Sequence, residues 1–417
     1  MNDLKNSVGE SKIVGSFSGL TRTNKMLLRL LRASQPVSRI EISRRMRINR
    51  SIVTDAFKPL IAAGVVREEQ IERLAEGVRL QGRPPIGLSF ASEREYFAGI
   101  NIGVRHSQVG LTTLDGEILA EEDFLTPENP NAALEIIKSR LQSLCAKFAA
   151  RKLEVIGVSV PGVTDSKRRT LVYAPRLDWR DVEIAASLEE IKFGKTKQKP
   201  KIVVENDATA AAVYESSLRL KKTTDGILKN FILVRSGTGI GVGFVIDGEV
   251  YRGIGKGKGL AGELGHTTIV AGGKPCYCGN RGCWERYAAA SAASSLYTGD
   301  RLRLGESEPP RFVEIVERAE AGEIRAQKTL EKIGEYLGIG IGNVITGSGV
   351  PHVIVSGRIV YGWKFIREPL KEAVGLSMAG KITEWSVEAG EPTGAGLGGA
   401  LEVAVEEFLA YGFNHIV

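Results

Sequence analysis

Between residues 21 and 64 the apolar residues recur every three or four positions, as they do in amphipathic helices. The pattern predicts three short helices. Pro36 and Ser38 separate the first two, and Glu41 follows Ser38 at the spacing of a capping box. Asn49 is a candidate N-cap for the third helix, and the turn before it is short enough for a helix-turn-helix.

From residue 96 onward, segments rich in valine and isoleucine alternate with stretches of helical periodicity. The strand-like segments are YFAGINIG, SQVGLTTL, VIGVSVPGV, KIVVEND, NFILVRSGTGIGVGFVI and HVIVSG. Cys145 lies in an amphipathic stretch and is expected to be a core residue. The alternation predicts an α/β protein whose sheets are covered by helices. By itself it does not distinguish a dinucleotide-binding fold from an actin-like or hexokinase-like ATPase fold.

Charge divides the chain into two parts. Residues 1–90 contain 16 basic and 8 acidic residues, a net charge of +8, whereas the other residues sum to −1. This asymmetry indicates a small polyanion-binding module, residues 1–90, attached to a neutral body, residues 91–417. No apolar run approaches the ~18 residues that a membrane helix needs, so we expect a cytoplasmic, nucleoid-associated protein with no membrane partner.

The third predicted helix begins with polar residues that can reach base edges or phosphates, as a recognition helix does. After it, VVREEQI is a candidate wing strand, and QGRPP is a basic turn that can follow a minor groove. The candidate DNA contacts are Ser38, Arg39, Asn49, Arg50, Ser51, Thr54, Lys58 and Arg83. The alternative is a three-helix bundle with a solvated basic face. Charge and pattern together favour binding to double-stranded DNA.

Three of the four cysteines lie within eight residues, in CYCGNRGCWE, shortly after the histidine of GELGH. The candidate metal ligands are His266, Cys276, Cys278 and Cys283. One nitrogen and three sulfurs suit tetrahedral Zn²⁺, and four protein ligands leave no open position, so the predicted zinc is structural. An iron–sulfur cluster is disfavoured because such clusters take four cysteines. The alternative is three free thiols in a loop.

Two further motifs indicate polar ligands. In SGTGIGVG, the backbone N–H groups of Gly237, Thr238 and Gly239 can surround an anion. The alternative there is a tight β-hairpin, because no helix follows. In VVENDATAAA, Asp207 can accept a proton from a bound hydroxyl, and Asn206 can bridge two hydroxyls. On that stretch alone, a helix cap formed by Asp207 is the favoured alternative.

The order of these motifs along the chain resembles one family. VPGV, APRLDW, ENDA, GTGIG, GELGH, CxCGxxxC and SGR follow one another as in the kinase-like domain of the ROK family, which joins sugar kinases with sugar-responsive repressors. The stretch from NKMLLRLLRAS to GVVREE, and the GRP after it, resemble the winged helix-turn-helix of the ROK repressors. The wing here is longer, because IERLAEGVRLQ is inserted.

This resemblance implies a fold and an assembly. An all-α winged helix-turn-helix domain would precede a two-lobed actin/hexokinase-like (ribonuclease H-like) α/β body of the ATPase type. One lobe would span roughly residues 91–210 together with the C-terminal helix, and the other roughly residues 211–395. The family resemblance also implies homodimers or homotetramers.

A sugar in the cleft between the lobes is a further implication of the resemblance. The residues that match the sugar contacts of the ROK kinases are Asn206, Asp207, Glu263, His266 and Glu285. Zinc would hold the segment carrying Glu263 and His266 against the segment carrying Glu285. Arg176 and Asp178, in APRLDW, lie where family members vary near the sugar, so they are candidates for tuning its selection.

The chain departs from the kinases at one motif. ROK kinases have D-x-G-G-T where the metal and phosphates bind, whereas this chain reads GINIGVRH. Asn101 stands in place of the aspartate, Val104 in place of the second glycine, and Arg105 in place of the threonine. An amide is a poor Mg²⁺ ligand, and a valine Cβ crowds a turn that should approach phosphate.

We therefore expect a repressor of carbohydrate-utilisation genes without efficient kinase activity, and with no catalytic residue beyond Asp207 as a vestigial base. Two copies would bind a palindromic operator, and the cleft would bind a sugar, or a sugar phosphate steadied by Arg105. One alternative is an ATP-dependent sugar kinase with a DNA-binding appendage. Another is a DNA-binding protein whose body only oligomerises.

Overall fold

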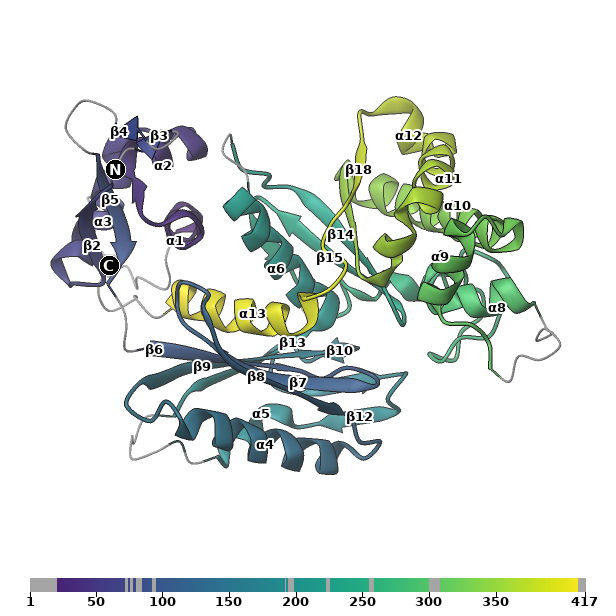
Figure 1. The fold of residues 1–417 in the computed structure, drawn as a ribbon, viewed down its shortest axis with the longest axis horizontal. Coiled ribbons are helices and arrows are strands. Elements are labelled where there is room, and N and C mark those ends of the chain that lie inside the picture. The colour runs from purple at the N-terminus through teal and green to yellow at the C-terminus, as the bar shows by residue number, and fades with distance from the viewer. Residues whose placement is uncertain are drawn as a thin grey trace, which may run out of the picture.

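The computed structural model describes residues 21–71, 74–75, 78–79, 85–91, 95–191, 193, 199–222, 226–254, 259–299 and 308–411. A small N-terminal module lies beside a body made of two lobes (Figure 1). Within these ranges, none of the helices combines the length and the apolarity that a membrane crossing requires.

The N-terminal module contains three helices and a small sheet. Its elements are α1 (Arg22–Ser34), β1 (Val37–Ser38), α2 (Arg39–Met46), α3 (Arg50–Ala62), β2 (Val66–Gln70) and β5 (Ile86–Phe90). The three predicted helices and their predicted caps are confirmed, since Ser38 accepts the N–H of Glu41 and Asn49 accepts the N–H of Ser51. Three residues join α2 to α3, which gives the predicted helix-turn-helix.

The wing makes the module α+β rather than all-α. The central strand β5 pairs antiparallel with β1 on one side and β2 on the other, because Leu88 and Phe90 bury their side chains against the helices. The predicted wing strand is β2. The inserted segment contains a short hairpin of β3 (Leu74–Ala75) and β4 (Val78–Arg79). Arg83, a predicted DNA contact, lies outside the described residues.

The first lobe is built on a five-stranded sheet. Its elements are β6 (Glu95–Asn101), β7 (His106–Thr112), β8 (Ile118–Leu125), α4 (Pro130–Ala146), β9 (Lys152–Val160), β10 (Val163–Thr164), β11 (Leu171–Ala174), β12 (Trp179–Val182), α5 (Ile184–Glu189) and β13 (Lys201–Asn206). The strand order is β13-β9-β6-β7-β8, and β10, β11 and β12 form a separate small sheet. Helices α4 and α5 cover one face, where Cys145 is buried as predicted, and α13 (Ala395–Tyr411) covers the other (Figure 1).

The second lobe repeats this topology. Its elements are α6 (Asp207–Lys222), β14 (Phe231–Ser236), β15 (Ile240–Ile246), β16 (Glu249–Tyr251), η2 (Glu263–His266), α7 (Glu285–Ala288), α8 (Ala292–Thr298), α9 (Phe312–Glu320), α10 (Ile324–Ser348), β17 (His352–Ser356), η3 (Arg358–Gly362), α11 (Trp363–Leu376), α12 (Met378–Ile382) and β18 (Ser386–Ala389). The order β16-β15-β14-β17-β18 has two antiparallel pairs followed by two parallel ones, as in the first sheet. The predicted two-lobed α/β fold is confirmed.

Two helices lie between the sheets. Helix α6 packs on β14 and β15, α13 packs on β6 and β9, and the two helices pack on each other (Figure 1). Helix α1 of the N-terminal module contacts both of them. Its apolar residues share one core with Val213 of α6 and Val403 of α13. The module is therefore packed against the body and not only tethered to it.

Candidate functional site

A cleft of about 560 Å³ lies between the lobes. The turn after β6 and the segment after β11 line it from the first lobe, and the β14–β15 turn and η2 line it from the second. Of the predicted site residues, those lining the cleft are Asp207, Gly237, Thr238, Gly239, Glu263, His266 and Glu285. Asn206 is buried at the end of β13, directly before Asp207. Tertiary structure thus brings together motifs that are up to 80 residues apart in the sequence.

The four predicted metal ligands form one cluster beside the cleft. Their ligand atoms all lie within 4.8 Å of one another. The Sγ atoms of Cys278 and Cys283 are 3.8 Å apart, and Cys276 Sγ is 3.4 Å from His266 Nδ1. A tetrahedron with Zn–S bonds of ~2.3 Å has edges of ~3.8 Å, which matches the sulfur separation. The cluster could therefore hold a metal ion.

Two of the three cysteines in the cluster, Cys276 and Cys283, are buried. Burial raises the pKa of both the Cys276 and the Cys283 thiol. A metal binds the thiolate form, so a bound cation would offset this cost of deprotonation. The chain next to Cys283 is held rigidly, because the fully buried Trp284 donates its indole N–H to the carbonyl oxygen of Tyr336 at 2.9 Å.

His266 belongs to both the cluster and the cleft. Its Nδ1 faces Cys276, whereas its Nε2 lies 3.6 Å from Glu263 Oε2. A histidine that ligates a metal through one nitrogen commonly donates the other N–H to a carboxylate, which orients both groups. The position of Glu263 in the cleft therefore depends on the cluster.

Asn206 holds Glu263 from the opposite side. Its Nδ2 donates to Glu263 Oε1 at 3.0 Å, and its Oδ1 accepts the N–H groups of Ala208 and Thr209. Asn206 is therefore the cap of α6, and the alternative in which Asp207 forms the cap is wrong. The reason is that α6 begins at Asp207 itself, so the side chain one position earlier reaches the free N–H groups.

Two glutamates occupy the deep part of the cleft. Burial, together with the neighbouring charges of Asp207 and Glu285, raises the pKa of Glu263 to about 8. A carboxyl group that keeps its proton near neutral pH can donate as well as accept a hydrogen bond. Glu285 is also buried, and its Oε1 accepts from Arg176 Nη2 at 3.5 Å across the cleft. Arg176 lines the cleft, whereas Asp178 is absent from the residues that line it.

Asp207 is paired with an arginine that the sequence motifs did not mark. Arg235 Nη1 lies 2.8 Å from Asp207 Oδ2. Arg235 is the single charged residue in FILVRS, the strand β14 that is otherwise largely buried. That interruption was the available signal, because a charge in a buried strand needs a partner. The carboxylate proposed as a vestigial base is thus already bound to a guanidinium.

The glycine-rich segment forms the tight β-hairpin that was the predicted alternative to an anion-binding loop. Strands β14 and β15 pair antiparallel, and the N–H of Gly237 donates to the carbonyl oxygen of Gly239 in the turn. Thr238 Oγ1 accepts from Arg358 Nη2 at 3.3 Å, and Arg358 also lines the cleft. Arg358 belongs to SGR, which the sequence marked as a motif without assigning this arginine a role.

The residues that replace the kinase motif also line the cleft, namely Asn101, Val104 and Arg105. Asn101 Nδ2 donates to Gln108 Oε1 at 3.2 Å, so the amide is held within the first sheet. Arg105 is exposed, and no described carboxylate lies within ion-pair distance of it. The segment from Asn101 to Arg105 therefore presents an amide and a cation to the cleft where the kinase motif has a metal-binding carboxylate.

The predicted DNA-contacting residues divide into two groups. Four of them are exposed on α3 and are spaced to share one face, namely Arg50, Ser51, Thr54 and Lys58. Ser38 and Asn49 are engaged as helix caps, and Arg39 forms an ion pair with Glu68 at 2.6 Å. The turn adds exposed Arg47, which the sequence analysis did not select. Its positive φ of 53° at the end of α2 was not detectable from the pattern.

Comparison with known proteins agrees with this architecture. Residues 97–407 match the ROK family. The chain is 30% identical over 354 residues to the xylose repressor of Bacillus subtilis (strain 168), covering 84% of this chain and 85% of that protein.

Two solved structures share the fold. A ROK family transcriptional regulator described as a homolog of the Escherichia coli MLC protein superposes with a TM-score of 0.70 at 22% identity, covering 93% of this chain and 96% of that one. A ROK family glucokinase from Streptomyces griseus, in complex with glucose and AMPPNP, superposes with a TM-score of 0.62 at 25% identity, covering 74% of this chain and 99% of that one. Because the family match spans about three quarters of its length, the chain belongs to the ROK family.

Proposed function

We propose that the protein is a DNA-binding transcriptional regulator, a repressor of carbohydrate-utilisation genes, whose operator affinity changes when a sugar or sugar phosphate binds in the cleft. One observation carries the proposal: a helix-turn-helix with an exposed polar face precedes the ROK body. The similar glucokinase aligns over 99% of its own length with 74% of this chain, so about a quarter of this chain lies outside the aligned part. The similarity to a xylose repressor extends over 84% of the chain.

Recognition of DNA is assigned to α3. Arg50, Thr54 and Lys58 recur every four residues and are exposed, so they can enter a major groove together. Two copies of the chain, in a homodimer or homotetramer, would place two such helices on a palindromic operator. A regulator of this kind acts in the cytoplasm at the nucleoid. The predicted boundary between the modules, near residue 90, follows β5.

Arg50→Ala is expected to weaken operator binding by ~10-fold or more, because a contact to a base or phosphate contributes on the order of 1–3 kcal/mol. Fluorescence anisotropy with operator DNA at two salt concentrations measures the effect. Arg367→Ala is the control, since this arginine is also exposed but lies on α11 in the second lobe. Unchanged affinity of the Arg50 variant would show that another face of the module meets the DNA.

The metal is proposed to be Zn²⁺, held by His266 and the three clustered cysteines. The donor set and the sulfur separation fit this ion, and four protein ligands make its role structural. When bound, the ion would supply positive charge and rigidity to the loop. Contacts to a ligand in the cleft would be made by side chains of the protein and not by the ion.

The sugar contacts are proposed to be Asp207, Glu263, His266 and Glu285, with Asn206 positioning Glu263 from behind. These side chains offer carboxyl and imidazole groups that can accept or donate hydrogen bonds to ring hydroxyls. Two arginines also line the cleft, namely Arg358, which donates to Thr238 of the hairpin, and Arg105. A guanidinium pairs well with phosphate, which supports a sugar phosphate as one form of the effector.

A thermal-shift screen tests the effector assignment. Hexoses, pentoses, N-acetylhexosamines and their phosphates are added to the full-length protein, because a ligand that binds the folded state raises its melting temperature. Gel-shift measurements with the sugars that bind then show whether operator affinity changes. If no sugar shifts the melting temperature, the body only oligomerises and the effector proposal fails.

The glucokinase similarity gives a second candidate function, a sugar kinase with a DNA-binding appendage. Two observations argue against it. Asn101 offers a neutral amide, which is a poorer Mg²⁺ ligand than a carboxylate. Oδ2 of Asp207 is bound to Arg235, so a substrate hydroxyl would have to displace a guanidinium to reach that oxygen.

We expect no hexose-dependent ADP release from ATP above the background of a sugar-free control, measured with a coupled assay. The Asn101→Asp variant is expected to remain inactive, because Val104 and the Asp207–Arg235 pair are unchanged. A ROK glucokinase serves as the positive control. ATP consumption that requires a hexose and disappears in Asp207→Ala would instead establish the kinase.

A further inference from the structure

Two helices run from the cleft to the DNA-binding module. Helix α6 begins with Asp207 in the cleft, and α13 begins beside Gly396, which also lines it. Farther along, α6 reaches α1 with Ser217, and α13 reaches it with Glu402 and Glu406. At ~1.5 Å per residue, the 16 residues of α6 span ~24 Å. The same two helices therefore contact both the cleft and the module.

Each of these helices is packed tightly on a different lobe. A Cβ at Gly157, on β9, would lie 2.2 Å from the carbonyl oxygen of Ala400, so α13 sits directly on the first sheet. A Cβ at Gly243, on β15, would lie 2.5 Å from the Cβ of Ala212, so α6 sits directly on the second sheet. The two helices also lie close to each other, since a Cβ at Gly399 of α13 would lie 3.0 Å from the backbone of Ala210 on α6. The contact between α6 and α13 is where the two lobes meet. If the lobes move, α6 and α13 must shift relative to each other.

Arg32 of α1 binds elements of both lobes. Its Nη2 and Nη1 donate to the two carboxylate oxygens of Glu402 at 2.8 and 2.5 Å, and its Nε donates to the carbonyl oxygen of Leu114 at 2.6 Å. From the other lobe, Ser217 Oγ of α6 accepts from Nη1 at 3.3 Å. The Arg32 side chain is only 5% exposed.

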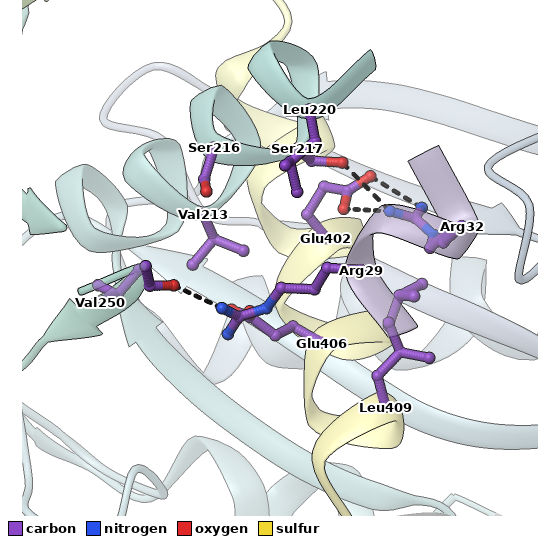
Figure 2. A pocket seen from close by; sticks show the side chains of 12 residues that line it. Arg29, Arg32, Val213, Ser216, Ser217, Leu220, Val250, Glu402, Glu406 and Leu409 are labelled. Carbon is purple, nitrogen blue, oxygen red and sulfur yellow. Dashed lines mark hydrogen bonds and ion pairs between the residues drawn. The ribbon is translucent and has the colours of Figure 1, made fainter. Parts of the chain in front are cut away.

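Arg29 forms a second bridge one turn away. It is ion-paired with Glu406 of α13, and its Nη1 donates to the carbonyl oxygen of Gly248 at 2.5 Å. Gly248 belongs to the turn between β15 and β16, and Glu249 in the same lobe lies 3.4 Å from Nη1. Figure 2 shows Arg29 and Arg32 extending from α1 toward the two glutamates of α13, with α6 alongside.

The end of α6 also contacts the helix-turn-helix itself. Arg45 of α2 donates from Nη2 to the carbonyl oxygen of Leu220 at 2.5 Å and from Nη1 to Ser34 of α1 at 2.6 Å. The side chains of α1, α2 and α3 share one apolar core. Movement of α1 therefore carries α3 with it.

We propose that Arg29 and Arg32 form an arginine clasp that couples lobe movement in the cleft to the position of the DNA-binding module. The inference rests on the proposed function and names its means of regulation. Breaking the ion pair of a buried guanidinium is costly. We therefore expect Arg29 and Arg32 to keep their partners when the lobes move and to move α1 with them. In an assembly of two copies, the shift would change the spacing of the two α3 helices and hence the fit to an operator.

The test compares Arg29→Met with Arg22→Ala in the full-length protein. Both arginines belong to α1 and contact the β15–β16 turn, but Arg22 is paired with Asp247 at an exposed position where such a pair contributes little. The measured quantity is the ratio of operator Kd with and without saturating D-xylose, or the sugar of the screen that gives the largest thermal shift. Arg29→Lys tests whether charge without the forked geometry suffices.

We expect sugar binding by calorimetry to stay within ~2-fold in all variants, while the operator Kd ratio of Arg29→Met falls at least ~5-fold toward unity, the lower end of typical coupling. Arg22→Ala should keep the wild-type ratio. A folded Arg29→Met protein with the wild-type ratio would overturn the clasp.

A second readout separates this inference from the proposed function. Amide hydrogen exchange of residues 22–34 should rise in Arg29→Met relative to Arg22→Ala, whether or not a sugar is present. If the wild-type protein shows no sugar response, the proposed function fails. In that case, unchanged amide hydrogen exchange of residues 22–34 in Arg29→Met overturns the clasp as well. Increased exchange in Arg29→Met instead supports the clasp as the contact that holds the module on the body.

Discussion

Replacing Cys283 by serine is expected to abolish binding of the proposed zinc ion and to destabilise the second lobe. Cys283 is fully buried, and its sulfur lies 3.8 Å from that of Cys278. Loss of one thiolate leaves three ligands and an incomplete tetrahedron, and loss of a structural metal is among the few single changes that lower the free energy of unfolding by on the order of 4 kcal/mol or more. Elemental analysis gives the zinc content, and thermal unfolding gives the stability.

The effect should extend to the cleft. His266 connects the cluster to Glu263, and Glu285 follows Cys283 by two residues. The Cys283→Ser protein is therefore expected to lose sugar binding in calorimetry. Cys145→Ser is the matched control, because Cys145 is also buried but lies on α4 in the first lobe. Zinc retained at one ion per chain in Cys283→Ser would contradict the ligand assignment.

Replacing Glu263 by alanine is expected to weaken sugar binding by on the order of 100-fold. Its two oxygens are held from behind by Asn206 and His266, so the group is preorganised in the cleft. Removing a buried partner of this kind costs about 1–3 kcal/mol per hydrogen bond lost, and a sugar hydroxyl would be left unpaired. Calorimetric titration measures the loss. Operator affinity in the absence of sugar should stay unchanged, because Glu263 lies in the cleft and far from α1.

Asp123→Asn is the control for this variant, since Asp123 lines the same cleft at an exposed position. Its sugar affinity should remain within a few-fold of the wild type. Equal titration heats for Glu263→Ala and the wild-type protein would remove Glu263 from the sugar site. Loss of binding in the Asp123 variant alone would place the ligand at the rim.

Local features were predictable because they depend on neighbours in the sequence. Helical periodicity marked α1, α2 and α3, and the short polar side chains of Ser38 and Asn49 marked their starts. The cysteine spacing was equally informative, because a loop of eight residues confines three sulfurs whatever surrounds them. The addition of His266 relied on the family resemblance and on donor chemistry, and the structure brings it to the cluster.

Contacts between distant segments were not predictable in the same way. The pairing of Arg235 with Asp207 joins residues on two different elements, and neither motif contained the other partner. Taken alone, the stretch around Asp207 favoured that residue as the cap of α6, whereas Asn206 forms it, because the choice depends on where the preceding strand ends. The sequence pattern indicated no partner for Arg29 and Arg32, since it does not show that α1 is buried against α6 and α13.

By itself the sequence determined the family, the two-lobed α/β body, the helix-turn-helix and the cysteine cluster, because each follows from local periodicity, spacing or an ordered series of motifs. Only the tertiary structure decided which charges meet. Ion pairs such as Arg32 with Glu402 join residues separated by 370 positions, and their formation depends on how whole helices pack. For this reason the components of the regulator could be predicted from the sequence, whereas the contacts that connect its cleft to its DNA-binding module could not.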